Sequence, residues 1–425
     1  MKKKGAWKEQ QIVASNECIM NSTPQRAGGH GSGVMPPCET AVEWLEIDRI
    51  APLAEIKISR FVGAGGVAEW HITVALKGDC PNSARALEEA WFCALDVAGL
   101  NPASTVMRRV FCSELVELFP QLGSFAGTYS GAFSAIGQPP LAGGGFALWS
   151  QHITDPDGPL KTSGDGACFS CTRGALSHDW ISGLCDTSGG NAFSQTEAVL
   201  EKQNQWLADH DMTLAENVVR TWWFVRDIDT DYQQLVDARR GVFNRHNLTE
   251  NTHYIASTGI AGAHPDSLAR LSLDSYAIRG LCPEQIEHLS APDHLGPTHL
   301  YGVTFERATA ISYADRRHIL ISGTASIDTA GNIVHPGNVL RQLDRTLENI
   351  AALLAAAEAG LNDLAMILVY LRNPADEPAI EKVLRQQFGN LPMLLLHAPV
   401  CRPGWLIEIE GVAIVATREP EFPEF

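Results

Sequence analysis

The sequence predicts an α+β fold built from similar units in tandem, each a β-sheet covered by two helices. Three observations support this prediction: segments recur at a constant offset, strand-like and helix-like segments keep the same order in each copy, and a glycine-containing turn precedes the last strand. The chain has 425 residues, of which 45% are hydrophobic, and this is enough for several cores. Each unit spans about 130 residues.

The first strand and the first helix of two copies lie 140 positions apart (321 − 181). Residues 180–189 and 320–331 are both apolar strands that end in a polar turn with glycine. A helical stretch then begins at Val199 and again at Val339. In the later copy, apolar residues recur at steps of three and four, as on one face of a helix; they are Leu340, Leu343, Leu347, Ile350 and Leu354.

The remaining strands recur as well. Residues 219–228 and 365–374 are β-branched and aromatic runs, which are typical of buried strands, and a second helix follows each. Residues 271–278 and 406–414 form the last strand of each copy. A fainter third copy lies upstream, where the four residues 98–101 recur at 359–362 and a strand follows at 106–112.

We therefore expect a flexible leader over residues 1–42 and three units over 43–155, 156–290 and 291–425. The leader is rich in Gly, Ser, Asn and Pro and shows no apolar periodicity. Three such units can pack their sheets together as a pseudo-trimer within a single chain. The expected state is a monomer with ligand clefts between the units.

Composition excludes several classes of partner. The net charge is −17 and no basic stripe is visible, so we expect no nucleic-acid partner. No stretch approaches the ~20 apolar residues of a membrane span, and no apolar run follows the basic start of the chain. The ten cysteines are scattered, which favours free thiols in the cytoplasm. No metal or organic cofactor is implied.

Two carboxylates alternate with isoleucines near the end of the chain. Period two in residues 407–410 puts Glu408 and Glu410 on one face of a strand. The second unit has an acid, Asp274, in place of Glu410, but Ser272 in place of Glu408. Glu410 is therefore interpreted as a shared interface acid, and Glu408 as peculiar to one cleft. A carboxyl group in a partly dry cleft has a raised pKa and can donate a proton.

Arginines and one cysteine are the other candidates. Arg226 and Arg372 occupy equivalent strand ends, and Arg220 precedes Arg226 on the same strand by an even number of residues. Guanidinium groups beside a cleft suit a carboxylate ligand. Cys401 lies in the turn before the Glu408 strand and is expected to touch the same ligand. Solvated acids, surface ion pairs and a packed thiol are the structural alternatives.

Several long motifs resemble the chorismatase branch of the RidA superfamily. They are residues 254–260, 313–328 and 398–410, with shorter likenesses at 136–140 and 303–307. The resemblance implies cleavage of the enolpyruvyl ether of chorismate, with Glu408 as the general acid and no cofactor. It places Tyr254 among the substrate-binding residues. Chorismate carries two carboxylates, which calls for more than one arginine.

The resemblance leaves the product and the reaction class open. Ala314 resembles the hydrolysing, diol-forming type, whereas Cys401 resembles the benzoate-forming type, and we favour 3-hydroxybenzoate. One alternative is an imine deaminase of the ordinary RidA kind, although Met393 stands where those proteins place a carboxylate-binding arginine. Another alternative is a non-catalytic protein that binds a small metabolite.

Overall fold

The computed structural model describes residues 41–45, 54–78 and 83–425. The described residues all belong to one compact unit by their contacts. The predicted leader lies outside the described residues, except for Ala41 and Val42. Among the described residues, no helix is both long and apolar enough to cross a membrane.

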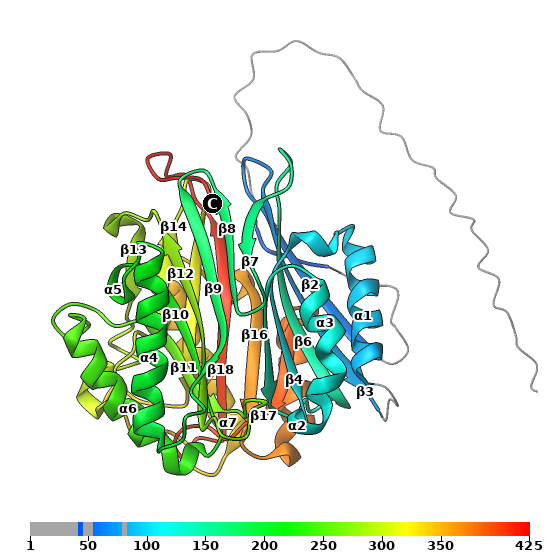
Figure 1. Ribbon diagram of the computed structural model, residues 1–425. Coiled ribbons are helices and arrows are strands. Elements are labelled where there is room, and N and C mark those ends of the chain that lie inside the picture. Colours follow the sequence, from blue (N-terminus) through cyan, green and yellow to red (C-terminus); the bar gives the residue numbers. More distant parts are fainter. Residues whose placement is uncertain (1–40, 46–53, 79–82) are drawn as a thin grey trace, which may run out of the picture. The chain divides into compact units, whose positions relative to one another are not determined.

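Three six-stranded sheets follow one another along the chain (Figure 1), one for each predicted unit. The first contains β1 (Glu43–Leu45), β2 (Ala54–Val62), β3 (Ala68–Lys77), β4 (Thr105–Cys112), β5 (Ala132–Gly137) and β6 (Gly143–Thr154). The second contains β7 (Lys161–Gly164), β8 (Cys168–Arg173), β9 (Leu176–Cys185), β10 (Val218–Val225), β11 (Ala256–Ala261) and β12 (Leu271–Arg279). The third contains β13 (Ile286–Leu289), β14 (Ala308–Ser312), β15 (Arg316–Ala325), β16 (Leu364–Leu371), β17 (Met393–His397) and β18 (Ile407–Ala416).

All three sheets have the same topology. In each, the strands lie in the spatial order first, second, third, sixth, fourth, fifth, and only the pair of fourth and fifth strands is parallel. The predicted α+β class with tandem units is therefore confirmed, and the first sheet shares the topology of the other two. One boundary differs from the prediction at residue 290, because the short strand β13 pairs with β14 in the third sheet. Strand β13 has only four residues, which is too short for an alternating pattern to identify it in the sequence.

Two long helices cover the second sheet and two cover the third, as predicted. They are α4 (Ala192–Asp209) and α6 (Ile228–Arg245), and α7 (Val339–Ala356) and α8 (Glu377–Phe388). The first sheet has one long helix, α1 (Ser83–Ala98), and the short helices α2 (Leu115–Leu118) and α3 (Gly123–Thr128) where a second long helix was expected. A further short helix, α5 (Leu214–Asn217), leads into β10.

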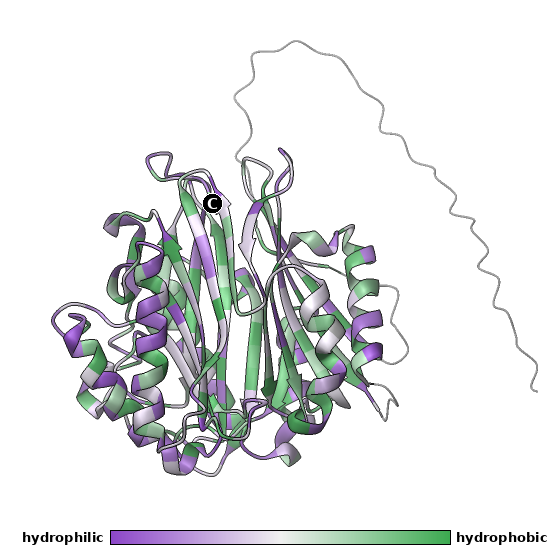
Figure 2. Ribbon diagram, in the orientation of Figure 1, coloured by the Kyte–Doolittle hydropathy of each residue, from purple (hydrophilic) through white to green (hydrophobic). Residues whose placement is uncertain are grey.

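Helix α7 shows how the sequence specifies these elements. The Asn338 side chain accepts a hydrogen bond from the Arg341 amide and so caps the first turn. The predicted apolar residues from Leu343 to Leu354 are buried against the third sheet, whereas Leu340 at the start of the helix is 41% exposed. Figure 2 shows the same division elsewhere: the strands are mainly hydrophobic, and the hydrophilic residues lie largely on the helices.

Each sheet contacts both of the others. Isolated backbone bridges join Gly137 to Ala263, Ile260 to Val400 and Leu396 to Pro140, so the end of each fifth strand meets the segment that follows the fifth strand of another sheet. These bridges form a closed cycle of three contacts. The edge strand β11 of the second sheet also packs against β15 of the third, next to the strand that carries Glu408.

A buried ion pair also lies at each of the three junctions. The pairs are Arg109–Asp274, Arg220–Glu410 and Arg316–Glu69, and every side chain in them is at most 3% exposed. Removing one partner of such a pair leaves an uncompensated buried charge, which costs about 3–5 kcal/mol. The pairs therefore fix which sheets adjoin, and Glu410 is confirmed as an interface acid.

Candidate active site

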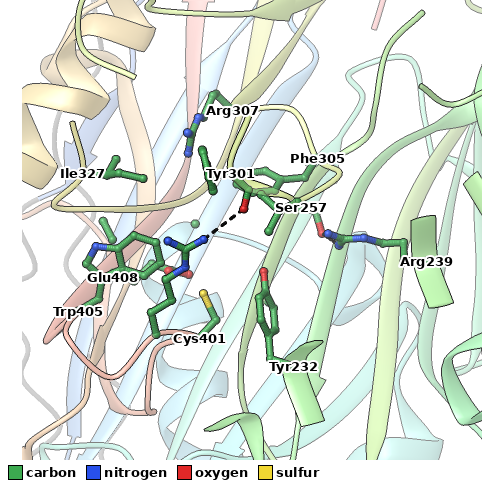
Figure 3. A pocket seen from close by; sticks show the side chains of 15 residues that line it. Tyr232, Arg239, Ser257, Tyr301, Phe305, Arg307, Ile327, Cys401, Trp405 and Glu408 are labelled. Atoms are coloured by element: carbon green, nitrogen blue, oxygen red, sulfur yellow. Dashed lines mark hydrogen bonds between the residues drawn. The ribbon is translucent and has the colours of Figure 1, made fainter. Parts of the chain in front are cut away.

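A cavity lies between the second and third sheets, with about 530 Å³ of space not filled by protein atoms, part of it open to solvent. The second repeat and the third repeat both contribute side chains, and ten of them are labelled in Figure 3. The lining residues are Tyr232, Arg239, Ser257, Gly259, Tyr301, Val303, Phe305, Arg307, Gly323, Ala325, Ile327, Cys401, Arg402, Trp405 and Glu408.

Glu408 is a buried acid in this cavity. It lies on β18, where Ile407 and Ile409 are fully buried, and its own exposed fraction is 4%. Burial and then the charge of Glu410 raise the pKa of Glu408 to about 8, while Arg220 and Arg307 act in the opposite direction. The carboxyl group is therefore mostly protonated at neutral pH and can act as a proton donor.

Glycine 323 makes room for that carboxyl group. Gly323 lies in β15 at a break in the register between β15 and β18. A Cβ atom at this position would be 2.2 Å from Oε1 of Glu408 and 3.1 Å from Cγ2 of Thr258. The Gly323 amide donates a hydrogen bond of 2.9 Å to the Thr258 hydroxyl, which holds the backbone close. Only glycine therefore fits here without displacing Glu408.

Two buried arginines from different repeats line the cavity. Arg239 on α6 donates from Nε to the Thr304 hydroxyl (3.1 Å) and from Nη1 to the Ser257 hydroxyl (3.4 Å). Arg307, directly before β14, donates from Nη2 to the Gly296 carbonyl (3.0 Å). Nη2 of Arg239 and Nε of Arg307 are buried and have no hydrogen-bond partner among the described residues. Unpaired guanidinium N–H groups suit the oxygens of an anionic ligand.

Aromatic rings and a third arginine form another wall. Arg402 stacks over the rings of Tyr301 and Trp405, at 5.3 and 5.1 Å from their centres. Its Nη2 donates to the Tyr301 carbonyl, the interaction drawn in Figure 3. Trp405 is fixed by a hydrogen bond of 3.0 Å from Nε1 to the Ser326 carbonyl. The wall therefore offers both an apolar surface, on which a ligand ring can pack, and a positive charge.

Cys401 lines the cavity, as the sequence predicts, and lies beside Tyr232 (Figure 3). Burial and the charge of Glu408 raise the pKa of the Cys401 thiol to about 12. The thiol is therefore neutral at physiological pH and lacks the thiolate form that a nucleophile needs. Its position favours contact with a ligand over covalent chemistry.

The three predicted arginines do not line the cavity. Arg220 is 2% exposed and is paired with Glu410. Arg226 binds the carbonyls of Asp266 and Ser267. Arg372 pairs with Asp229 and binds the carbonyls of Val400 and Trp405. Arg226 and Arg372 follow the last residues of β10 and β16, where strand parity no longer sets the direction of a side chain.

Tyr254 and Ala314 also lie outside the lining. Tyr254 is buried, and its ring stacks with Phe243 of α6. Ala314 lies in the turn between β14 and β15, where its amide donates to the Pro423 carbonyl. Among the predicted site residues, the structure therefore brings together only Glu408 and Cys401.

The sequence interpretation missed Arg239, Arg307 and Arg402. Arg307 ends the motif at 303–307 and Arg402 follows Cys401, so both stood in segments already singled out. Tyr232 and Arg239 are seven residues apart on α6, which puts them on one helix face. That spacing was the one feature of the sequence from which a contribution of α6 to the cavity could have been inferred.

Comparison with known proteins adds to this geometry. A family model described as endoribonuclease L-PSP matches residues 308–415. A RutC family protein of Pyrococcus abyssi is 32% identical over 97 residues, which are 22% of this chain and 76% of that protein. The chain belongs to the RidA superfamily. The expected family membership is thus confirmed, and the match falls in the third repeat, which carries Glu408.

Longer matches connect this RidA-superfamily protein with chorismatases. A 3-hydroxybenzoate synthase of Streptomyces hygroscopicus is 29% identical over 225 residues, 47% of this chain and 64% of that protein. A solved structure of a chorismatase has a TM-score of 0.58 at 20% identity and covers 73% of this chain and 93% of its own. At that identity the second likeness shows the fold alone. The match to the synthase leaves about a third of it uncovered.

Proposed function

We propose that the protein cleaves the enolpyruvyl ether of chorismate, with release of pyruvate and 3-hydroxybenzoate or a dihydroxycyclohexadiene carboxylate. The observation that supports this most directly is a buried, protonated Glu408 in a cavity that also holds cations from two repeats. The names of the similar 3-hydroxybenzoate synthase and chorismatase point to the same reaction class.

The proposed reaction begins with the transfer of a proton from Glu408 to a carbon atom of the substrate. Glu408 gives its proton to the terminal methylene carbon of the enolpyruvyl group, and the resulting oxocarbenium ion carries its charge next to the newly formed carboxylate of Glu408. Water then adds to the cation, the hemiketal collapses to pyruvate and the dihydroxycyclohexadiene carboxylate, and the proton released by water returns to Glu408. Formation of 3-hydroxybenzoate needs a further step, in which this diol loses its other ring hydroxyl as water together with the hydrogen on the former ether carbon, so that the ring becomes aromatic.

Arg239 and Arg307 are suited to hold the two carboxylates of chorismate. Arg239 comes from α6 of the second repeat and Arg307 from the third repeat, and each has a buried N–H group without a partner among the described residues. In this proposal each guanidinium group binds one carboxylate of the dianion. Arg220, Arg226, Arg372 and Tyr254, which the sequence suggested as direct ligands, have partners elsewhere and are given no direct contact in this proposal.

The position of Cys401 favours 3-hydroxybenzoate as the product. Its neutral thiol lies in the cavity with Trp405 and Tyr301, where a substrate ring would pack. Ala314, which suggested the diol-forming type, has no contact with this cavity. We also propose a monomer with internal pseudo-threefold arrangement, supported by the closed cycle of contacts between the sheets. A cytoplasmic location is proposed because the seven cysteines of the described residues are free thiols.

A RidA-type imine deaminase is the second candidate, favoured by the match to the RutC family protein. Met393 begins β17 and does not line the cavity, so the usual arginine is absent from its expected position. Arg307 would have to bind the substrate carboxylate instead. A protein that only binds a carboxylate metabolite needs the arginines but has no use for a protonated Glu408.

One set of incubations separates the three functions. The full-length protein is incubated with chorismate, pyruvate is followed with a coupled dehydrogenase, and the ring product is identified by chromatography. Release of pyruvate with 3-hydroxybenzoate is the expected result. If the protein hydrolyses iminobutanoate and leaves chorismate unchanged, it is an imine deaminase. Binding of chorismate without turnover of either compound would leave the metabolite-binding function.

A further inference from the structure

Glu410 has an environment opposite to that of Glu408, although the two share a face of β18. Their Cα atoms are separated by two strand residues, or about 6.6 Å. Glu410 is 2% exposed and receives four hydrogen bonds. Oε1 accepts from Tyr370 (2.8 Å) and Trp222 (3.1 Å), and Oε2 accepts from Arg220 and from the Thr258 hydroxyl.

These four donors come from both adjoining sheets. Arg220 and Trp222 lie on β10 and Thr258 on β11 of the second sheet, whereas Tyr370 lies on β16 of the third. Both oxygens of Glu410 are satisfied, and one donor is a guanidinium group, which is the arrangement that stabilises a charged carboxylate. By contrast, none of the described residues donates a hydrogen bond to the Glu408 carboxyl. Hydrogen-bond donors thus stabilise a charged carboxylate at Glu410, whereas burial favours the neutral acid at Glu408.

We propose that Glu410 is a positioning residue that keeps Glu408 protonated. Its fixed negative charge opposes ionisation of Glu408 across the shared strand face. It also neutralises Arg220, whose charge would otherwise favour an ionised Glu408. The proposal rests on the acid role proposed for Glu408.

The other groups that face Glu408 do not supply this effect. Tyr232 and Arg239 face the cavity from α6, Tyr301 and Arg307 from the segment before β14, and Cys401 and Arg402 from the turn before β18. The arginines among them favour a carboxylate at 408, and Cys401 is neutral. Burial is the largest cause of the raised pKa of Glu408, and among the described residues Glu410 is the negative charge that adds to it.

The test measures the ionisation of Glu408 without any substrate. Infrared difference spectra between the protein and its Glu408→Gln variant report the protonated carboxyl group as pH is raised. In a Glu410→Gln background, the pKa of Glu408 is expected to fall by at least about 1, a tenfold change in its ionisation equilibrium. An unchanged pKa in the folded variant would overturn the proposal, whether or not chorismate is the substrate.

A second pair of variants covers the case in which Glu410→Gln does not fold. Arg220→Met leaves the charge of Glu410 without its cation and is expected to raise the pKa of Glu408. Adding Glu410→Gln removes both charges together and is expected to bring that pKa back down, by at least tenfold in the equilibrium. Equal pKa values in the Arg220→Met protein and in the double variant would contradict the proposal. If the role of Glu410 is purely structural, Arg220→Met raises the pKa of Glu408 and the double variant shows the same raised value.

Where pyruvate release from chorismate is observed, kcat/KM adds a second readout. Its high-pH limb is expected to move to lower pH in Glu410→Gln and to return towards the original position in the double variant. If the infrared shift appears but chorismate is not turned over, the role of Glu410 stands and the proposed function fails.

Discussion

The buried acid at position 408 makes the stability of the protein depend on pH. The pKa of Glu408 is raised by burial from 4.5 to about 8. Because the folded-state pKa is raised, this carboxyl group does not oppose folding below pH ~4.5, and stability is lost as pH rises through ~8. Each pH unit between these values costs about 1.4 kcal/mol. The loss is therefore about 3 kcal/mol at pH 7 and about 5 kcal/mol above pH 9.

The Glu408→Gln variant removes this dependence while it keeps the shape of the side chain. Its free energy of unfolding should equal that of the unmodified protein at pH ~4.5 and exceed it by about 3 kcal/mol at pH 7. Urea unfolding of both proteins between pH 5 and 9 measures the difference. Glu201→Gln, an exposed position on α4, is the matched control and should give parallel curves. If the Glu408→Gln curve also runs parallel to that of the unmodified protein, the acid is not buried in its neutral form.

Further predictions follow from the same cavity. Gly323→Ala puts a Cβ 2.2 Å from Oε1 of Glu408, so kcat/KM for chorismate should fall at least ~10²-fold, whereas Gly127→Ala, which meets no atom within 4 Å, should have no effect. Arg239→Met and Arg307→Met should each raise the KM for chorismate about tenfold or more, and Arg226→Met should change it less than about threefold; the reverse order would refute the assigned carboxylate ligands. Cys401→Ala should alter the ring product seen by chromatography while pyruvate is still released, because the pKa of the thiol is about 12; abolished release would show a nucleophilic cysteine.

The repeat made most of the fold predictable. A recurring order of apolar strands and amphipathic helices constrains all copies together, so the degenerate first copy could be assigned from the two clearer ones. The position of Glu408 was also predictable, because alternation with Ile407 and Ile409 fixes which face it occupies. The inward face of the last strand then had to meet a neighbouring sheet.

The ligand arginines were not predictable by the same means. Arg226 lies one residue beyond β10, where the chain turns, and its guanidinium group donates to carbonyls of the loop between β11 and β12. Arg220 is on the expected face, but its guanidinium group is paired with Glu410. Arg239 reaches the cavity from a helix, and Arg307 from a segment outside the strands. Whether these side chains reach the cavity depends on how whole sheets and helices pack. The periodicity of the strands does not determine this packing.

The central claim is that Glu408 donates the proton that starts cleavage of the enolpyruvyl ether. It is tested most directly by the kcat/KM for pyruvate release from chorismate in the unmodified protein and in Glu408→Gln at pH 7. The account predicts a loss of at least ~10²-fold in the variant, with chorismate still bound as judged by calorimetry. Pyruvate release by Glu408→Gln within a few-fold of the unmodified protein would contradict it.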